Sequence, residues 1–291
     1  MLTRNWLTSS AQGRRLMIWT MILVTWEAAY RIVGWSAIRF PAPTLLIDST
    51  ASMLGHETFF GEPFHKGWPG RPADYLPSNL PPTPFLKEPL IEANLVSGIR
   101  LILGFTMSVA LGALFGALMW RWKEMDELFG PLFLGLQTLP SVCWVPLAIM
   151  IYGLTEQGIL FVLVMGSFSG VAISLRDGLR TIPPLYQRAG AMLGARGWRM
   201  YRYVLLPASL PALAGSLRQG FSFAWRSLMG AEVIFAVQRR GLGWLLQTGR
   251  DLNDVAQVVT VMIVMVMIGM IVDRFAFAKI EKHIAARFGL A

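Results

Sequence analysis

Long apolar segments recur along this 291-residue sequence, and they constrain its fold more than any other feature. A helix needs about 20 apolar residues to cross the hydrocarbon core of a bilayer. Charged residues make up only 15% of the chain, whereas a soluble chain carries about 25%. The sequence therefore predicts an all-α, polytopic membrane protein. Six spans are predicted, at residues 16–35, 95–120, 129–152, 158–175, 208–236 and 255–277.

Three of these segments have distinctive features. Small residues recur every four positions in the second span, at Gly104, Ser108, Gly112 and Gly116, and this spacing predicts close packing against another helix. The third span contains Pro140 and Pro146, and the fourth is short. Prolines are tolerated in a spanning helix where neighbouring helices or a cavity satisfy the freed carbonyl groups. We therefore expect the third span to be broken and to lie inside the bundle.

Basic residues are unevenly distributed about the predicted spans, and the formal net charge is +9. Fifteen of the 26 Lys and Arg residues lie on the side of the two termini, eight lie on the opposite side, and three fall inside spans. Basic residues concentrate on the cytoplasmic side of membrane helices, so this charge indicates a bilayer rather than nucleic acid. We expect a cytoplasmic N-terminus (1–15), a transmembrane domain (16–277) containing a cytoplasmic loop (176–207), and a cytoplasmic tail (278–291).

Motifs of catalysis are missing. The sequence contains no G-x-x-x-x-G-K-[ST] phosphate-binding loop, no H-E-x-x-H, no Cys/His cluster and no G-x-S-x-G. Cys143 is the single cysteine, and there are three histidines. We therefore expect no catalytic residue, no metal site and no ATP hydrolysis by this chain.

The segment 185–203, LYQRAGAMLGARGWRMYRY, is too polar to span a membrane and too helix-prone for a simple loop. Its spacing predicts a helix, a turn at Gly194 and a second short helix that places Trp198, Tyr201 and Leu205 together. Two interpretations follow. The segment is either a docking surface for a cytoplasmic partner or an interfacial helix that rests on anionic headgroups.

Residues 188–207 resemble the cytoplasmic-loop motif of permease subunits of binding-protein-dependent ABC importers, which is written EAA–x3–G–x9–I–x–L–P. Gly194, Leu206 and Pro207 match this motif, and Val204 replaces its Ile. The first triplet differs, because it reads Arg188-Ala189-Gly190 instead of Glu-Ala-Ala.

The resemblance implies that 185–203 is the coupling helix, which seats in a cleft of an ATPase subunit. In that role Gly194 lets the chain turn, Pro207 starts the fifth helix, and Trp198 and Tyr201 join the contact. ATP and Mg would be bound by the ATPase.

Other segments are similar to the nitrate/sulfonate/taurine/bicarbonate branch of these permeases. They are FPAP at 40–43, the P…LP…VPL pattern within 131–158, and the AW…AE and GLG segments within 216–246. The Pro-rich, external residues 57–90 look like an insertion. The resemblance implies the type I ABC importer permease fold, a homodimer in the bacterial inner membrane, cytoplasmic ATPase subunits and an external binding protein. It also implies a small anionic substrate.

Polar and ionisable residues inside the predicted spans are candidates for lining a pathway, because such residues are expensive at membrane depth. They are Gln137, Thr138, Ser141, Arg218, Gln219, Ser222, Arg226 and Glu232. Either Arg218 or Arg226 could face the pathway and attract an anion. The alternatives are structural Arg–Glu pairs that tie helices together, or an Arg100 side chain that snorkels to an interface.

Two other functions compete with the importer. An ATP-independent secondary transporter or channel would show paired broken helices and an internal repeat. The sequence has no convincing repeat, and such a transporter would not need residues 185–203. A membrane scaffold that only anchors a partner is the third possibility.

Overall fold

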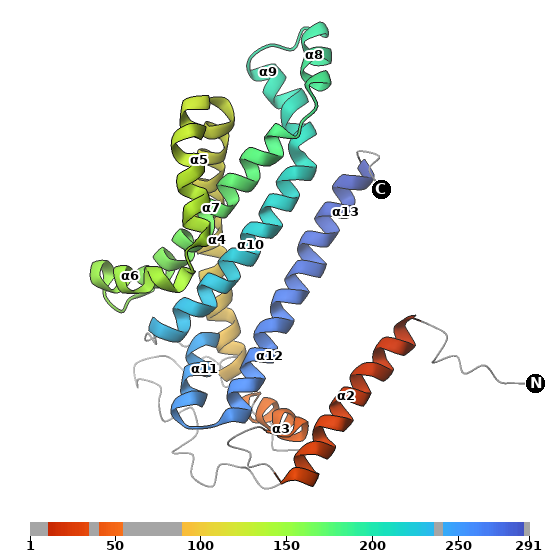
Figure 1. The fold of residues 1–291 in the computed structure, drawn as a ribbon, viewed down its shortest axis with the longest axis vertical. Helices are drawn as coiled ribbons and strands as arrows, with labels where there is room; N and C mark the ends of the chain where they lie inside the picture. The colour runs from red at the N-terminus through yellow and green to blue at the C-terminus, as the bar shows by residue number, and fades with distance from the viewer. Residues whose placement is uncertain (1–10, 35–40, 55–88, 236–240, 288–291) are drawn as a thin grey trace, which may run out of the picture. The chain divides into compact units, whose positions relative to one another are not determined.

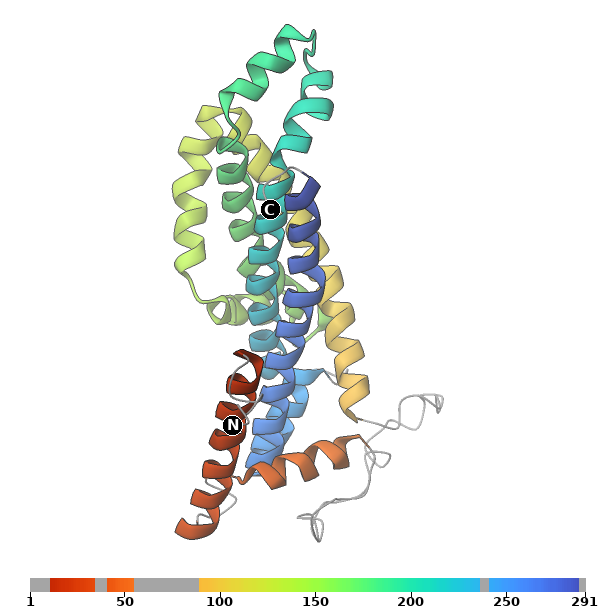
Figure 2. The same ribbon diagram turned by 90° about the vertical axis from the view of Figure 1, so that its right-hand side faces the viewer.

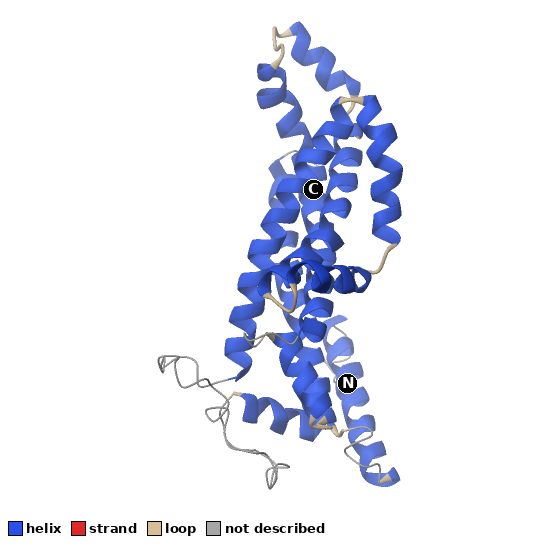
Figure 3. Cartoon of the chain, turned by 90° about the vertical axis from the view of Figure 1, so that its left-hand side faces the viewer, coloured by secondary structure: helices blue, strands red, loops and turns tan. Residues whose placement is uncertain are grey.

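The computed structural model describes residues 11–34, 41–54, 89–235 and 241–287, and every regular element in these ranges is a helix (Figures 1 and 3). The prediction of an all-α chain is confirmed for them. The chain forms two compact units, one from residues 1–93 and 245–264 and the other from residues 94–244 and 265–291. The predicted insertion 57–90 lies outside the described residues, apart from its last two positions.

The first unit contains α2 (Ala11–Val33), α3 (Pro43–Met53), most of α11 (Leu242–Asp251) and the first half of α12 (Val255–Val272). Side chains 16–24 of α2 are exposed, as expected for a helix that faces lipid. The carboxylate of Glu27 on α2 accepts a hydrogen bond from the hydroxyl of Thr44 at 3.3 Å. Thr260 on α12 donates to the carbonyl of Leu46 at 3.3 Å. These bonds join α3 to both neighbouring helices.

The second unit holds the other helices, apart from the first turn of α4, and the remaining parts of α11 and α12. In chain order its elements are α4 (Pro89–Arg121), α5 (Lys123–Thr138), the 3₁₀ turn η2 (Ser141–Trp144), α6 (Val145–Tyr152), α7 (Glu156–Arg180), α8 (Pro184–Met192), α9 (Trp198–Met200), the π-helical η3 (Tyr201–Leu205), α10 (Leu206–Phe235), the start of α11, the end of α12, the π-helical η4 (Asp273–Phe277) and α13 (Ala278–Arg287). Helices α7 and α10 lie side by side (Figures 1 and 2).

The small residues of α4 pack against α7, as the sequence predicts. A Cβ on Gly104 would lie 2.7 Å from the Leu163 side chain, and one on Gly116 would lie 2.7 Å from the Ala172 carbonyl. Between these two glycines, the Ser108 and Ser167 hydroxyls form a buried hydrogen bond of 2.7 Å. The glycines therefore bring the two backbones close enough for this polar contact between helices.

Among the described residues, four helices are long and apolar enough to cross a membrane, and a fifth span results if α5 and η2–α6 are counted together. Helix α10 is 30 residues long but is not among them, because Arg218, Arg226 and Glu232 interrupt its apolar sequence. Length and composition therefore show a polytopic protein, with four or five candidate spans in the part of the chain that the structure describes.

The third predicted span is broken, as expected, by a 103° bend between α5 and η2. Pro140 lies in this break, whereas Pro146 lies in the first turn of α6, where a missing N–H breaks no helical bond. The expectation that Pro146 also breaks the helix is wrong. Within the single chain α6 is buried on one side only, because Val145 is 3% exposed whereas Met150 is 84% exposed; the expectation of an interior span stays a prediction.

Two predicted lengths also need correction. The fourth span is not short, because α7 has 25 residues; its charged ends, Glu156 and Arg180, hid its length from a search for apolar residues. The last helix does not end at residue 277. It continues through η4 and α13 to Arg287, because the π-helical turn keeps the backbone helical beyond the last apolar segment.

Candidate functional site

The connection between α7 and α10 forms the helix–turn–helix that the sequence predicts. Helix α8 ends at Met192, and Gly194 follows with a positive φ of +81°. The N–H of Gly194 donates to the Ala191 carbonyl at 3.1 Å, and the N–H of Ala195 donates to the Gly190 carbonyl at 2.9 Å. This is a Schellman motif, which satisfies the last carbonyls of a helix and favours glycine at the left-handed position. The predicted turn at Gly194 is confirmed.

Two further glycines shape this connection. Gly197 also has a positive φ, of +52°, which the sequence analysis did not predict. Gly190 is buried where α8 meets the next helix, and a Cβ there would lie 2.9 Å from both Met200 Sδ and Val204 Cγ2. Glycine at position 190, where the related motif has alanine, therefore lets α8 pack directly on the start of the next helix.

Residues 184–200, which we call the α8–α9 tip, lie at the end of the α7 and α10 pair (Figure 1). Large apolar side chains are exposed on this tip. They are Leu185 (72% exposed), Met192 (88%), Leu193 (88%) and Trp198 (78%). Arg188, Ala189, Arg196 and Arg199 are exposed as well, and no ion pair found in the described part of the chain involves these arginines. An apolar patch of this kind marks an interaction surface.

The start of the next helix differs from the prediction in two ways. Leu205 is 5% exposed, so it does not join Trp198 on a shared exposed face; Tyr203, 74% exposed, reaches the surface instead. The side chain of Tyr201 is not among those described. Pro207 is the second residue of α10, but helical structure continues upstream from Leu206 through η3 to Trp198. Proline therefore does not start this helix, and the π-helical turn accommodates its missing N–H.

Four of the predicted pathway residues form a polar stripe along one side of α10: Arg218, Gln219, Ser222 and Arg226. The last three are exposed. The Arg226 Nε–H donates to the Ser222 carbonyl at 3.0 Å, and its guanidinium lies 5.1 Å from the Phe223 ring centroid. No carboxylate pairs with Arg226 in the described ranges. The guanidinium is therefore oriented by its own helix and keeps its terminal donors exposed.

The predicted pathway residues of the third span occupy the end of α5 and the bend. Gln137 donates to the Ser169 carbonyl on α7 at 3.3 Å, and Thr138 donates to the Gly135 carbonyl at 2.7 Å. Ser141 lies beside Gly166, where the side chain of Ser227 also lies. Ser141 thus comes near Ser227, which follows Arg226 on α10.

Glu232 does not belong to the polar stripe, because it is 2% exposed and paired. Its carboxylate accepts hydrogen bonds from Arg100 at 2.7 Å and from the Ser97 hydroxyl at 2.7 Å. Arg100 also forms a bidentate pair with Glu156 on α7, at 2.7 and 2.5 Å. Arg100 therefore does not snorkel to an interface. Its ion pairs with Glu156 and Glu232 tie α4, α7 and α10 together. We call these groups the Arg100 network.

The Arg100 network also caps α11. The Leu242 N–H donates to Ser97 Oγ at 2.9 Å, and the Gly243 N–H donates to Glu232 at 3.1 Å. These are two of the amide groups that a helix start leaves without intrahelical partners. A Cβ on Gly241 would lie 2.5 Å from the Glu232 carboxylate oxygens. The GLG segment is therefore needed for close approach to Glu232, and the sequence analysis missed this contact.

Arg218 is a tie between helices. Its guanidinium donates to both carboxylate oxygens of Asp273 on η4, at 2.6 and 2.7 Å, and to Glu281 on α13 at 2.8 Å. All three side chains are between 32% and 39% exposed. Arg218 is therefore the partly exposed, paired member of the stripe, whereas Arg226 has no carboxylate partner among the described residues.

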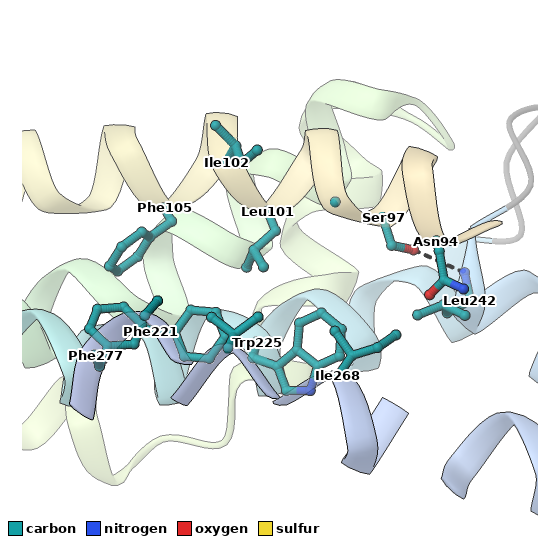
Figure 4. A pocket seen from close by; sticks show the side chains of 13 residues that line it. Asn94, Ser97, Leu101, Ile102, Phe105, Phe221, Trp225, Leu242, Ile268 and Phe277 are labelled. Atoms are coloured by element: carbon teal, nitrogen blue, oxygen red, sulfur yellow. Dashed lines mark hydrogen bonds between the residues drawn. The ribbon is translucent and has the colours of Figure 1, made fainter. Parts of the chain in front are cut away.

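An apolar cavity of about 340 Å³ lies between α4, α10 and the last helix (Figure 4). Phe105, Phe221, Phe277 and Trp225 point into it, and Ser97 borders it near Leu242. This lining offers almost no partner to a polar solute. Among the described residues, no group of three or more His, Cys, Asp or Glu side chains could hold a metal ion.

Comparison with known proteins gives the context of these features. Residues 108–285 match the family described as binding-protein-dependent transport system inner membrane component. The chain is similar to MJ0413 of Methanocaldococcus jannaschii, whose name places it among ABC transporter permeases: 31% identity over 64% of this chain and 69% of that protein. It is also similar to the bicarbonate transport system permease protein CmpB of Synechococcus elongatus, at 24% identity over 65% of this chain and 68% of that protein.

A third relative is the nitrate import permease protein NrtB of a Synechocystis strain, at 23% identity over 60% of this chain and 63% of that protein. Among solved structures, the chain resembles one from the inward-facing conformations of the MetNI methionine ABC transporter. The TM-score is 0.57 and the identity 20%, over 67% of this chain and 96% of that one. This likeness concerns the fold.

Proposed function

This chain belongs to the family of binding-protein-dependent transport system inner membrane components, and from that premise we propose that it imports a small anionic solute, driven by a separate ATPase. Family membership makes it a multi-pass inner membrane permease of an ABC importer and a noncatalytic component of that system. The proposal adds the site that meets the ATPase, the pathway, the partners and the class of solute.

The α8–α9 tip is the proposed contact with a cytoplasmic ATPase subunit, which binds ATP and Mg. The exposed side chains of Met192, Leu193 and Trp198 support this role. An apolar patch with arginines around it can fill a cleft in another protein. The contact includes Arg188, Ala189 and the start of α10 at Leu206 and Pro207. If the tip lies on the cytoplasmic side, both terminal segments, residues 1–15 and 278–291, lie in the cytoplasm too.

The polar stripe of α10 supports an assembly of two copies around a pathway. Gln219, Ser222 and Arg226 are exposed, and such residues are costly in contact with lipid. A second copy, with a water-filled path between the two copies, keeps them away from lipid. Closed two-fold assemblies are the commonest oligomers. In this arrangement α10 crosses the membrane despite its charges, and six spans of the type I fold result.

The solute is proposed to be a small anion of the nitrate, bicarbonate or sulfonate type. The main support for this class is that Arg226 is exposed on the stripe and has no carboxylate partner in the described residues. The relatives named for bicarbonate and nitrate transport agree with this class. An external binding protein delivers the anion from the other side of the membrane.

Uptake into vesicles tests this function. The protein is reconstituted with its ATPase and binding protein, and labelled nitrate, bicarbonate and taurine are supplied with and without ATP. We expect ATP-dependent uptake of one of them, at least tenfold lower in Arg226→Gln and largely kept in Arg226→Lys. Uptake that needs no ATP would show a secondary transporter or channel instead. An Arg226→Gln complex that falls apart would remove Arg226 from the pathway.

A further inference from the structure

An ion cluster joins the start of α5 to the end of α7, close to the α8–α9 tip. Asp126, in the first turn of α5, accepts a hydrogen bond from Arg176 Nη1 at 3.0 Å and another from Arg180 Nη2 at 2.7 Å. The side chains of Asp126 and Arg176 are 18% and 11% exposed, and that of Arg180 is 47% exposed. One carboxylate therefore holds two arginines of the neighbouring helix.

The packing around this cluster leaves little freedom. A Cβ on Gly130 would lie 2.8 Å from Arg176 Nη1, so the absence of a side chain on α5 makes room for the guanidinium. Arg176 Nε–H also donates to Asp177 at 2.9 Å. Arg176 is thus held from both helices, and the first two turns of α5 are fastened to the last turns of α7.

The cluster is close in sequence to the tip. Helix α7 ends at Arg180, and α8 begins at Pro184. The intervening Ile182 is 6% exposed, and Pro183 and Pro184 each have a fixed φ. A displacement of the tip is therefore passed to Arg180 through a short, stiff and anchored connection.

Helix α5 continues from Asp126 toward the candidate pathway. Thr138 follows 12 residues later, which is about 18 Å along a helix. The 103° bend comes next, and then Ser141, which lies near Ser227 on α10. The ion cluster thus links α7, which leads into the tip, to α5, which leads to the candidate pathway.

We propose that Asp126 is a positioning residue through which movement of the α8–α9 tip reaches α5 and the bend at Pro140. This inference rests on the proposed function, because it assumes that an ATPase moves the tip. A second route into the membrane exists through η3 and α10, which continue the helix from Trp198. The Asp126 cluster makes α5 follow the same movement, so that both walls near Ser141 shift together.

The test measures uptake per ATP hydrolysed in the reconstituted complex. In Asp126→Asn we expect the ATPase to co-purify in its usual amount while uptake per ATP falls at least fivefold. Asp126→Glu, which keeps a carboxylate at this position, should retain at least half of the wild-type ratio. Glu127→Gln is the matched control, because Glu127 is 66% exposed and, among the described residues, pairs only with Lys123 on its own helix, at 3.3 Å; its ratio should not change.

An unchanged uptake per ATP in Asp126→Asn would overturn the inference, and so would an Asp126→Glu variant that binds the ATPase but is as uncoupled as Asp126→Asn. If Asp126→Asn does not accumulate in the membrane, Arg180→Gln, which removes only the half-exposed arm of the cluster, should still lower the ratio at least twofold. An unchanged ratio there also overturns the inference. Failure of the proposed function is distinct, because the wild-type protein would then bind no ATPase.

Discussion

The α8–α9 tip and the Arg100 network use similar residues in opposite ways. On the tip, Met192 and Trp198 are exposed, and Arg196 and Arg199 have no carboxylate partner within the described residues. In the network, Arg100 and Glu232 are buried, and they form hydrogen bonds with each other and with neighbouring helices. The difference shows that an arginine of this chain points to a binding partner only where no carboxylate of the same chain pairs with it.

Membrane energetics explain the contrast. A charge at membrane depth is costly unless it is paired, so Arg100 and Glu232 have to meet each other inside the chain. An arginine in water carries no such cost, and the apolar side chains beside it are the groups that still lack cover. The network therefore holds the fold, whereas the tip is the surface that we propose to bind another protein. Substitutions at four positions test this contrast, starting from the largest expected effect.

Removing Glu232 should have the largest effect on stability. Glu232→Ala leaves the buried Arg100 with one carboxylate fewer and removes the acceptor for the Gly243 N–H. Breaking a buried pair by deleting one partner costs about 3–5 kcal/mol. Thermal unfolding of the purified protein in detergent should show a clear drop in Tm. A Tm equal to that of the wild type would contradict the structural role of the network.

Truncating Trp198 should do the reverse, with a large effect on partner binding and little on stability. Trp198 is 78% exposed, so the isolated chain loses few contacts in Trp198→Ala. A central aromatic anchor of an interface is worth about 2 kcal/mol or more, which is roughly a thirtyfold loss of affinity for the ATPase. Titration of the ATPase against the reconstituted protein measures it. Unchanged affinity together with a lowered Tm would place Trp198 in the fold instead.

The turn of the tip should respond to backbone strain. Gly194 has a φ of +81°, and the left-handed conformation costs a residue with a side chain about 1–2 kcal/mol. Gly194→Val should therefore weaken ATPase binding roughly tenfold, and Gly194→Asn should weaken it less, because Asn tolerates this region better. Gly135→Ala is the control, since Gly135 is helical and has open space beside it. Equal effects of Val and Asn would exclude strain as the cause.

The Arg218 cluster should give the smallest effect. Arg218, Asp273 and Glu281 are each about one-third exposed, and exposed ion pairs contribute about 1 kcal/mol or less. Arg218→Gln should lower the Tm in detergent by much less than Glu232→Ala does. A loss as large as that of Glu232→Ala would show that burial does not separate the two clusters.

The sequence predicts the tip better than the network, and the reason is the distance between the residues involved. The tip lies within 17 consecutive residues, so helical spacing and Gly194 are enough to predict its helix–turn–helix. The network joins Ser97, Arg100, Glu156, Glu232 and Gly243, whose pairing depends on how four helices pack. Composition alone therefore suggested Glu232 as a pathway residue, although its neighbours bury it. Helix ends were missed for a related reason, since apolar runs stop before the helices α7 and α13 do.

Site-specific photocrosslinking at the tip tests the central claim most directly. A photoreactive phenylalanine analogue replaces Met192, which is 88% exposed, and in a parallel sample it replaces Met150, which is 84% exposed on α6. After irradiation of native membranes, the probe at position 192 should give one dominant adduct with an ATPase subunit, and the probe at position 150 should give none. If position 192 forms adducts with lipid alone, the α8–α9 tip is an interfacial helix and the docking account is wrong.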